Sequence, residues 1–158
     1  MRTAIFALTP EGGHLALRLC DAMTEAFLFL PERIQHHIPA KCSVQYFKRL
    51  SEVICTAFTR YDVLVFVMAT GIVVRMIAPY VKSKLYDPAV LVFDEQGQHG
   101  ISLLSGHIGG ANAFTKKLCS AVGADPVITT ATDVTGRLAP DAVAAQLALR
   151  PVPKRAIQ

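Results

Sequence analysis

The sequence predicts an α/β domain built on an open, mainly parallel sheet, with helices on both faces in Rossmann-like layers and one antiparallel hairpin. Three observations lead to this fold class. Short apolar stretches alternate along the chain with longer segments of helical periodicity. Residues 63–68 are apolar at every position, as in a central parallel strand covered on both faces. A turn-forming cluster at 94–98 separates two strand-like stretches, which is typical of a hairpin.

The first half of the chain begins with two strand–helix alternations. Thr9 precedes Pro10 and a periodic apolar segment, so its hydroxyl group is a candidate helix cap. His36, His37 and Pro39 lie in a polar stretch that favours a loop. The expected elements are a strand at 4–8, a turn at 9–13, a helix over about 14–24, a strand at 26–30, a loop at 32–43 and a helix at 46–58.

The second half continues the alternation and adds the hairpin. Gly123 follows a helical pattern and is a plausible cap at its C-terminal end. We expect residues 1–150 to form a single domain and residues 151–158 a disordered or extended tail. The expected elements are strands at 62–68 and 89–93, a helix at 72–81, a hairpin turn at 94–98, a strand at 99–104, a helix after 112, a strand at 126–130 and a short helix at 141–149.

Composition indicates a compact globular domain. A chain of 158 residues with 52% hydrophobic residues can bury a substantial core. Its apolar runs are shorter than the roughly 18 residues of a membrane span, and Glu11 interrupts the first apolar stretch too early for a signal peptide. The net charge of +4 alone does not distinguish nucleic acid from a small polyanionic ligand, although no basic stripe is present. We expect a cytoplasmic protein that binds neither nucleic acid nor membranes.

The four cysteines show no CxxC spacing, so we expect no zinc site among them. Cys20, Cys55 and Cys119 fall in helical patterns. We interpret these three as core or half-buried helix thiols in a reducing cytosol.

The stretch from Ser105 to Asn112, here called the octet, has the sequence Ser-Gly-His-Ile-Gly-Gly-Ala-Asn. It leads from a strand-like run into a helical pattern. Glycines allow the backbone to approach a ligand closely, and free amide groups at a helix start favour an anion. This composition predicts a binding turn in which Gly106, Gly109 and Gly110 bring backbone to the ligand beside His107.

Four loops at strand ends are expected to form one site. They are residues 9–13, 69–75, the octet and residues 129–136. If the strands are parallel, all four meet at the carboxyl edge of the sheet, where ligands bind in such folds.

Individual residues of these loops have both structural and functional interpretations. His107 suits the role of a general acid or base, a metal ligand or an oxyanion anchor. The structural alternative is a turn histidine that is hydrogen-bonded to the backbone. Arg75, near Gly71, suits a bidentate contact with a ligand carboxylate. The structural alternative is an exposed arginine whose aliphatic stem covers apolar surface. Asp133 either caps a turn or orients His107. Thr130 and Thr132 are candidates for ligand oxygens, although β-branched residues are common at strand ends.

Several familiar motifs are missing from the chain. Ser105 does not lie in a G-x-S-x-G elbow, so a hydrolase triad on it has weak support. The glycines follow neither the dinucleotide-binding pattern nor the P-loop pattern.

Several blocks in order resemble the N-terminal region of the CbiG family. They lie between about residues 62 and 136, nearly half of the chain. The blocks are Gly71-Ile72-Val73-Val74-Arg75, Ala78-Pro79, Lys84 with Asp87-Pro88-Ala89-Val90, Asp94-Glu95-Gln96-Gly97, Ile101 through Asn112, and Val127 through Asp133.

The resemblance implies an enzyme of anaerobic cobalamin biosynthesis. CbiG opens the δ-lactone of cobalt-precorrin-5A with water and releases acetaldehyde, giving cobalt-precorrin-5B. This substrate is a tetrapyrrole rimmed with carboxylates, which suits a basic chain and Arg75. Its cobalt arrives with it, so no cofactor and no protein metal site are expected.

For the reaction that the resemblance implies, our hypothesis gives roles to the candidate residues. We expect His107, Asp133 and Ser105 to be catalytic, with Asp133 orienting His107 and the amides of Gly109 and Gly110 holding a tetrahedral oxyanion. The residues expected to bind substrate are Gly71, Arg75, Gly106, Gly109, Gly110, Asn112, Thr130 and Thr132.

Typical members of the family continue into a middle segment and a C-terminal domain that resembles CobE. We expect that domain to be absent from this chain and to be a possible partner. Two alternatives to the hydrolase stay open, a non-catalytic tetrapyrrole-binding module that needs this partner and an α/β binder of nucleotide or phosphate.

Overall fold

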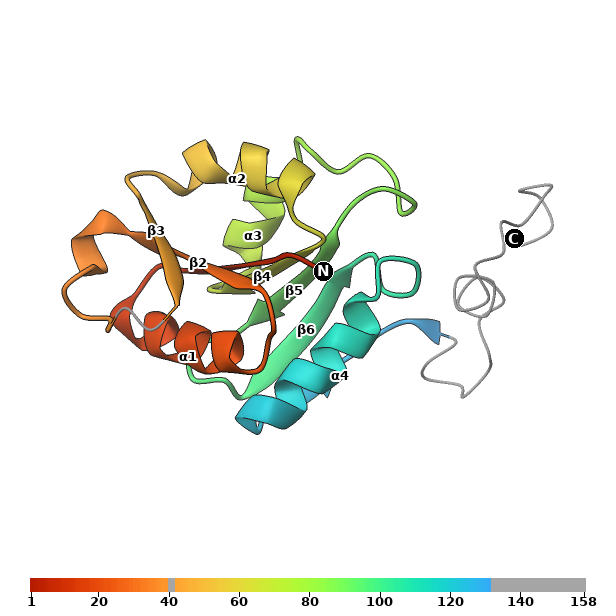
Figure 1. Ribbon diagram of the computed structural model, residues 1–158. Helices are drawn as coiled ribbons and strands as arrows, with labels where there is room; N and C mark the ends of the chain where they lie inside the picture. The colour runs from red at the N-terminus through yellow and green to blue at the C-terminus, as the bar shows by residue number, and fades with distance from the viewer. Residues whose placement is uncertain (40–41, 132–158) are drawn as a thin grey trace.

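The computed structural model describes residues 1–39 and 42–131, in which one seven-stranded sheet lies between two layers of helices (Figure 1). The strand order is β3-β2-β1-β4-β5-β6-β7. The strands are β1 Thr3–Ala7, β2 Ala26–Pro31, β3 Ser43–Phe47, β4 Val63–Val67, β5 Ala89–Phe93, β6 His99–Leu104 and β7 Asp125–Val127.

Strand direction divides the sheet into two parts. The five strands β1 to β5 are all parallel to one another. Strand β6 returns antiparallel to β5, and β7 runs parallel to β6. We call the edge at which β1 to β5 end the carboxyl edge, and the opposite edge, at which β6 ends, the octet edge. The mainly parallel sheet and its antiparallel hairpin are confirmed.

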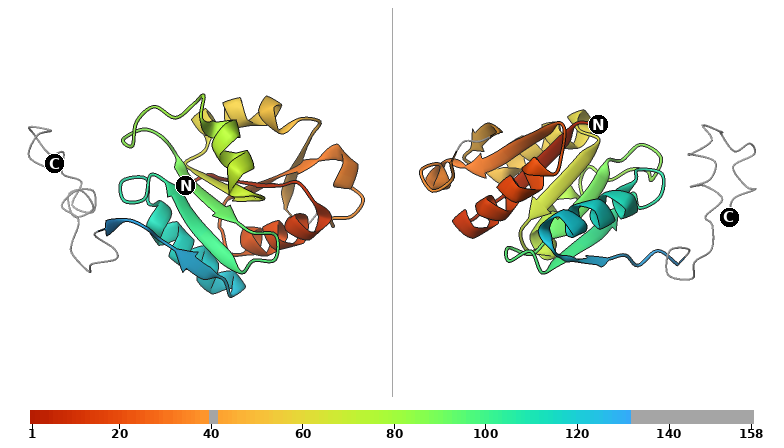
Figure 2. Two further views of the ribbon diagram at one scale, coloured as in Figure 1. Left: turned by 180° about the vertical axis from the view of Figure 1, so that it is seen from behind. Right: turned by 60° about the horizontal axis from the view of Figure 1, so that its bottom comes forward.

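Within the described residues, two helices cover each face of the sheet. Helices α1 (Pro10–Asp21) and α4 (Ala111–Val122) lie side by side on one face, as Figure 2 shows, and pack on the same core cluster. Helices α2 (Leu50–Arg60) and α3 (Thr70–Ile77) pack on the other. Strand β4 is fully buried between them because all five of its side chains are apolar. The prediction of helices on both faces is confirmed.

Helix α1 begins four residues earlier than predicted. The Thr9 hydroxyl accepts the Gly12 amide hydrogen at 3.1 Å, which confirms the predicted cap, and the helix continues through Gly13. A Cβ on Gly13 would lie 2.6 Å from Ile38 Cδ1. The glycines at this position therefore allow close packing inside the first helical turn, whereas the sequence interpretation assigned them to a turn.

The predicted helix at 46–58 is wrong at its start. Residues 43–47 form edge strand β3, in which exposed side chains alternate with more buried ones, and α2 follows from Leu50. The predicted loop at 32–43 contains a short 3-10 helix, Glu32–Ile34, called η1. Cys55 is exposed, while Cys20 and Cys119 are buried as predicted.

The remaining predicted elements differ only at their ends. Helix α3 is shorter than the predicted 72–81, and β7 is displaced from 126–130 to Asp125–Val127. Gly123 caps α4 in the left-handed conformation, as predicted. In the described part of the chain, no helix combines the length and the apolar character that crossing a bilayer requires. The predicted helix at 141–149 and the tail at 151–158 lie outside the described residues.

Candidate functional site

The octet lies beside the first residues of β5, because β6 delivers it to the edge where the parallel strands begin. The Ser105 hydroxyl donates to the Asp87 carbonyl oxygen at 3.0 Å. An added Cβ on Gly109 would lie 3.5 Å from the Ala89 nitrogen. The turn therefore packs directly against the segment that leads into β5.

Crowding and backbone strain concentrate inside this turn. Ser105 has a φ of 58°, in the left-handed region that side chains other than glycine rarely adopt. A Cβ on Gly109 would lie 2.5 Å from the Ser105 Cβ and 2.9 Å from its carbonyl oxygen. Only glycine fits at Gly109. Strain of this kind is typical of functional turns, and no pattern in the sequence indicated it.

The amide groups at the start of α4 are used by the turn itself. Gly110 donates to the His107 carbonyl at 3.1 Å, Ala111 to that of Ser105 at 3.2 Å, and Asn112 to that of Gly106 at 3.0 Å. The hydrogen of Gly110 closes a turn, so this geometry lends no support to Gly110 in the expected pair of oxyanion donors, which stays a prediction. In the described residues, the amide of Gly109 makes no hydrogen bond and stays available. The alternative of a phosphate-binding site at the start of α4 would need the same amide donors, which the turn already uses.

Asn112 holds the octet to strand β6 and to the segment that follows β7. Its side chain is buried, accepts from the Ser102 hydroxyl at 2.6 Å and donates to the Thr130 hydroxyl at 3.0 Å. A Cβ on Gly106 would lie 2.8 Å from the Asn112 Oδ1. The amide therefore positions the turn from within, and Ser105 likewise spends its hydroxyl on the Asp87 carbonyl.

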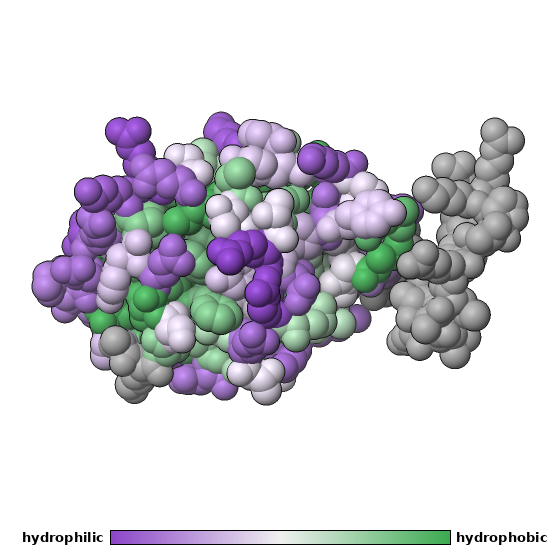
Figure 3. All heavy atoms as spheres, turned by 45° about the horizontal axis from the view of Figure 1, so that its top comes forward, coloured by the Kyte–Doolittle hydropathy of each residue, from purple (hydrophilic) through white to green (hydrophobic). Residues whose placement is uncertain are grey.

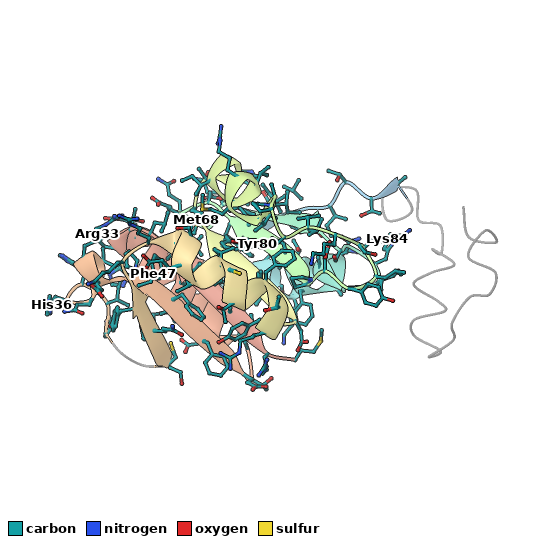
Figure 4. The ribbon with its side chains drawn as sticks, turned by 90° about the horizontal axis from the view of Figure 1, so that it is seen from above. Arg33, His36, Phe47, Met68, Tyr80 and Lys84 are labelled. Atoms are coloured by element: carbon teal, nitrogen blue, oxygen red, sulfur yellow. The ribbon has the colours of Figure 1, made fainter. Side chains whose placement is uncertain are left out.

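A hollow of about 260 Å³, here called the octet hollow, opens beside His107. It brings together the imidazole-bearing turn, Thr130 after β7 and Lys84 from the loop between α3 and β5. Figure 4 shows Lys84 at the outer end of that loop, at the opposite end of the molecule from Arg33 and His36. The residues that line the octet hollow are Lys84, Ser105, Gly106, His107, Ile108 and Thr130.

Lys84 was not predicted as a site residue, although it stands in one of the blocks quoted for the family resemblance. Its loop is fixed by the Asp87 carboxylate, which accepts the backbone amide hydrogens of Lys82 and Ser83 at 2.9 Å each. One sequence signal could have pointed to Lys84. Asp87 lies five residues after Lys82 and four after Ser83, a spacing at which a carboxylate can accept backbone amides and close a compact loop.

The predicted meeting of four loops at one edge is wrong. Residues 9–13 and 69–75 lie at the carboxyl edge, where the Thr9 hydroxyl donates to Glu95 at 2.8 Å. The octet and residues 129–131 lie at the other edge, because β6 and β7 run against the parallel strands. Thr132 and Asp133 lie outside the described residues, so the expected orientation of His107 by Asp133 stays a prediction.

Gly71 and Arg75 are correspondingly separate from His107. Both are exposed on α3, which begins at the carboxyl edge, and neither lines the octet hollow. The Arg75 guanidinium donates to the Gly71 carbonyl oxygen at 2.8 Å within the same helix. Their predicted contact with a ligand shared with His107 has no support in this geometry.

The carboxyl edge has an acidic hairpin turn. Asp94 accepts the backbone amides of Gln96, Gln98 and His99. Burial acts to raise the pKa of Asp94, but these three bonds and the nearby His99 outweigh it and lower the pKa below its ordinary value.

Comparison with known proteins places these features in a family. The family model described as cobalamin synthesis G N-terminal matches residues 52–133, a little more than half of the chain, and this range contains the octet and the loop of Lys84. The chain is 49% identical to the cobalt-precorrin-5A hydrolase of Salmonella typhimurium over 147 residues, which are 93% of this chain and 40% of that protein.

Two further relatives agree. The chain is 38% identical to a cobalt-precorrin-5A hydrolase of Priestia megaterium over 132 residues, 83% of this chain and 35% of that one. A crystal structure of a cobalamin biosynthesis protein G homolog from Sulfolobus solfataricus matches the fold with a TM-score of 0.59 at 24% identity. That match covers 99% of this chain and 43% of the other chain.

The chain thus spans about two fifths of the length of these relatives. The matched range holds β4 to β7 with the strained turn between them. The match over more than half of the chain, together with the close curated relatives, shows that this chain belongs to the CbiG family.

Proposed function

We propose that this chain carries the hydrolytic site of a cobalt-precorrin-5A hydrolase, and that the site is the octet hollow. The observation that carries the proposal is the joint position of His107, Lys84 and Thr130 around the strained turn of Ser105. Relatives named as this hydrolase support the reaction class.

In the proposed reaction, the oxygen of a water molecule bonds to the lactone carbonyl carbon and the acyl C–O bond breaks. His107 accepts the proton of the attacking water or donates one to the leaving alkoxide. The free amide hydrogen of Gly109 stabilises the charge on the carbonyl oxygen in the tetrahedral intermediate. The products of this step are a carboxylate and an alcohol. The alcohol then loses its hydroxyl proton as the C–C bond between its carbon and the macrocycle breaks, so that the C20 fragment leaves as acetaldehyde and the electron pair of that bond stays on the macrocycle.

Other residues of the site position these groups. Ser105 and Asn112 hold the turn through their bonds to Asp87, Ser102 and Thr130. The Lys84 ammonium forms no ion pair within residues 1–39 and 42–131, so it can approach a substrate carboxylate. Asp133 as the residue that orients His107, and Thr132 as a ligand to substrate oxygen, remain part of the proposal.

The proposal includes a cytoplasmic location, a cobalt supplied by the substrate and a C-terminal CobE-like domain as partner. The partial coverage of the relatives supports such a domain. Its role would be to cover the octet hollow.

The test is release of acetaldehyde from cobalt-precorrin-5A by the chain, with and without an equimolar C-terminal domain of a relative. We expect release, faster when the domain is present, and a large loss in a His107→Asn variant in both settings. Saturable binding of the substrate with no acetaldehyde in either setting would instead identify a tetrapyrrole-binding module.

A further inference from the structure

A larger hollow adjoins the octet hollow, and the proposed chemistry at His107 does not use it. Its volume is about 710 Å³, within the usual range for small-molecule sites. Ile108 lines both hollows, and Gly109 lines the larger one. The loop after α3 separates them, with Lys84 on one side and Lys82 and Tyr86 on the other.

Four aromatic side chains line the larger hollow. Phe58 and Tyr80 lie with ring centroids 6.0 Å apart, and Tyr61 and Tyr86 complete the set. Figure 4 shows Tyr80 between α2 and the loop that carries Lys84. Tyr86 is 87% exposed, which is unusual for an aromatic side chain without a partner. Such a lining suits the flat apolar face of a large conjugated ring.

Hydrophobic surface continues from the hollow onto the loop. Val81 and Leu85 are 40% and 41% exposed beside Tyr86. Figure 3 shows a strongly hydrophobic patch among hydrophilic atoms at the end of the molecule where this loop lies in Figure 1. A ligand bound here would therefore cover apolar surface that is open to water in the chain alone.

The charged side chains that line the larger hollow differ in whether they already have a bonding partner. The carboxylates of Asp62 and Asp87 accept backbone amide hydrogens, from Arg2 at 2.9 Å and from the 82–83 segment. The Arg2 guanidinium donates to the Arg60 carbonyl oxygen and lies 5.6 Å from the Tyr61 ring centroid.

The side-chain cations of Arg60 and Lys82, in contrast, form no ion pair within the described residues. Both therefore remain available to an anionic ligand.

We propose that the larger hollow binds the flat face of a polycarboxylate macrocycle, with Arg60 and Lys82 each pairing with a peripheral carboxylate. The shared wall at Ile108 then places an edge of the ring over the octet hollow. The identity of the ligand rests on the proposed function, whereas the assignment of the hollow rests on its own aromatic lining and unpaired cations. Arg60 and Lys82 thus become specificity-determining residues.

The binding test uses uroporphyrin, a flat macrocycle with eight carboxylates, and follows its absorbance on titration with the 158-residue chain. The variants Arg60→Gln and Lys82→Gln each remove one cation. We expect each to raise the Kd about fivefold and the pair about 25-fold, with less effect at high salt. Lys48→Gln, which removes an exposed cation after β3, is the matched control and should change the Kd less than twofold.

Tyr86→Ala is a second, independent variant, because so exposed a ring contributes little to the folded core. We expect it to raise the Kd about threefold through lost ring contact. An unchanged Kd in the Arg60→Gln/Lys82→Gln chain, or no saturable uroporphyrin binding by the parent chain, would overturn the inference.

Turnover separates this inference from the proposed function. With cobalt-precorrin-5A, the double variant should raise KM while kcat at saturating substrate stays near the parent value. An unchanged KM with normal acetaldehyde release would refute the inference and leave the hydrolase intact. Cation-dependent uroporphyrin binding without acetaldehyde release would refute the hydrolase and leave the binding site intact.

Discussion

The two edges of the sheet are built from similar parts and differ in chemistry. At each, a strand leads into a helix, through the glycine-rich octet at one edge and with glycines in the first helical turn at the other. At the carboxyl edge, Asp94 and Glu95 make the surroundings acidic, and His99 lies 3.8 Å from the Asp94 carboxylate. At the octet edge, Lys82 and Lys84 form no ion pair within the described residues, and Lys82 lines a hollow together with four aromatic side chains. An anionic ligand is attracted by Lys82 and Lys84 and repelled by Asp94 and Glu95.

This difference follows from the reversal of one strand, which moves the proposed site to the other edge. Ligands of parallel α/β sheets bind at the carboxyl edge, and the strand order of β1 to β5 has its switch point between β1 and β4. Here the hairpin turns β6 around, so the glycine-rich turn opens at the opposite edge. The proposed chemistry follows the turn rather than the general rule for the fold.

The largest contrast between the edges is expected from their histidines. His107→Asn should lower kcat/KM for acetaldehyde release at least about a hundredfold, because general acid–base catalysis is lost. His99→Asn, at the acidic edge, should leave it within twofold. Steady-state assays of both variants at equal concentration make the comparison, and a larger loss from His99→Asn would reverse the assignment of the edges.

Replacing a glycine with alanine should lower the free energy of unfolding at the octet edge and raise it at the carboxyl edge. Gly109→Ala forces a Cβ to within 2.5 Å of Ser105, so we expect a loss of about 1–3 kcal/mol in the free energy of unfolding. In Gly71→Ala the new methyl meets only the mobile end of Arg75, at 3.1 Å, and replacing helical glycine should add about 0.5–1 kcal/mol. Denaturant titration measures both, and equal effects would show that the octet is not a crowded turn.

Two aspartates offer a matched comparison of loop anchoring. Asp87 and Asp94 both hold a loop by accepting backbone amides. Asp87→Ala and Asp94→Ala should each cost about 1 kcal/mol of stability. Only Asp87→Ala should also weaken uroporphyrin binding, since it frees the segment that carries Lys82. Equal binding by the two variants would separate the loop from the ligand site.

The smallest expected effect is on how the thermal stability of the chain depends on pH. Because the folded pKa of Asp94 is lowered, its stabilising contribution is complete above the unfolded value near 4 and is lost as pH falls through the folded value. The Tm difference between the parent chain and Asp94→Asn should therefore narrow between pH 6 and pH 3. Calorimetry at these pH values measures it, and a difference that widened with acidity would contradict the sign of the shift.

The fold was largely predictable because burial leaves a periodic signal. The apolar run of β4 indicated its central place, and the residues 94–98 indicated the hairpin. Strand β3 was missed because an edge strand buries little and its short alternation resembles half of a helical pattern. The glycines of α1 were misread because close packing and turn formation select the same residue.

The site was less predictable than the fold. His107 and the octet stood out by composition, but the meeting of four loops assumed parallel strands throughout. The predicted hairpin already implied that the chain after β6 leaves at the other edge. Lys84, the left-handed Ser105 and the committed amide of Gly110 depend on contacts distant in sequence or on backbone angles, which local patterns do not encode.

The most direct test of the octet edge as the ligand site is a titration of the nitrogen-15-labelled chain with uroporphyrin, followed through backbone amide resonances. The structure predicts that the largest shifts fall in residues 82–87 and 105–112, with little change in residues 9–13, 69–75 and 94–99. The largest shifts in the second group of segments would contradict this account.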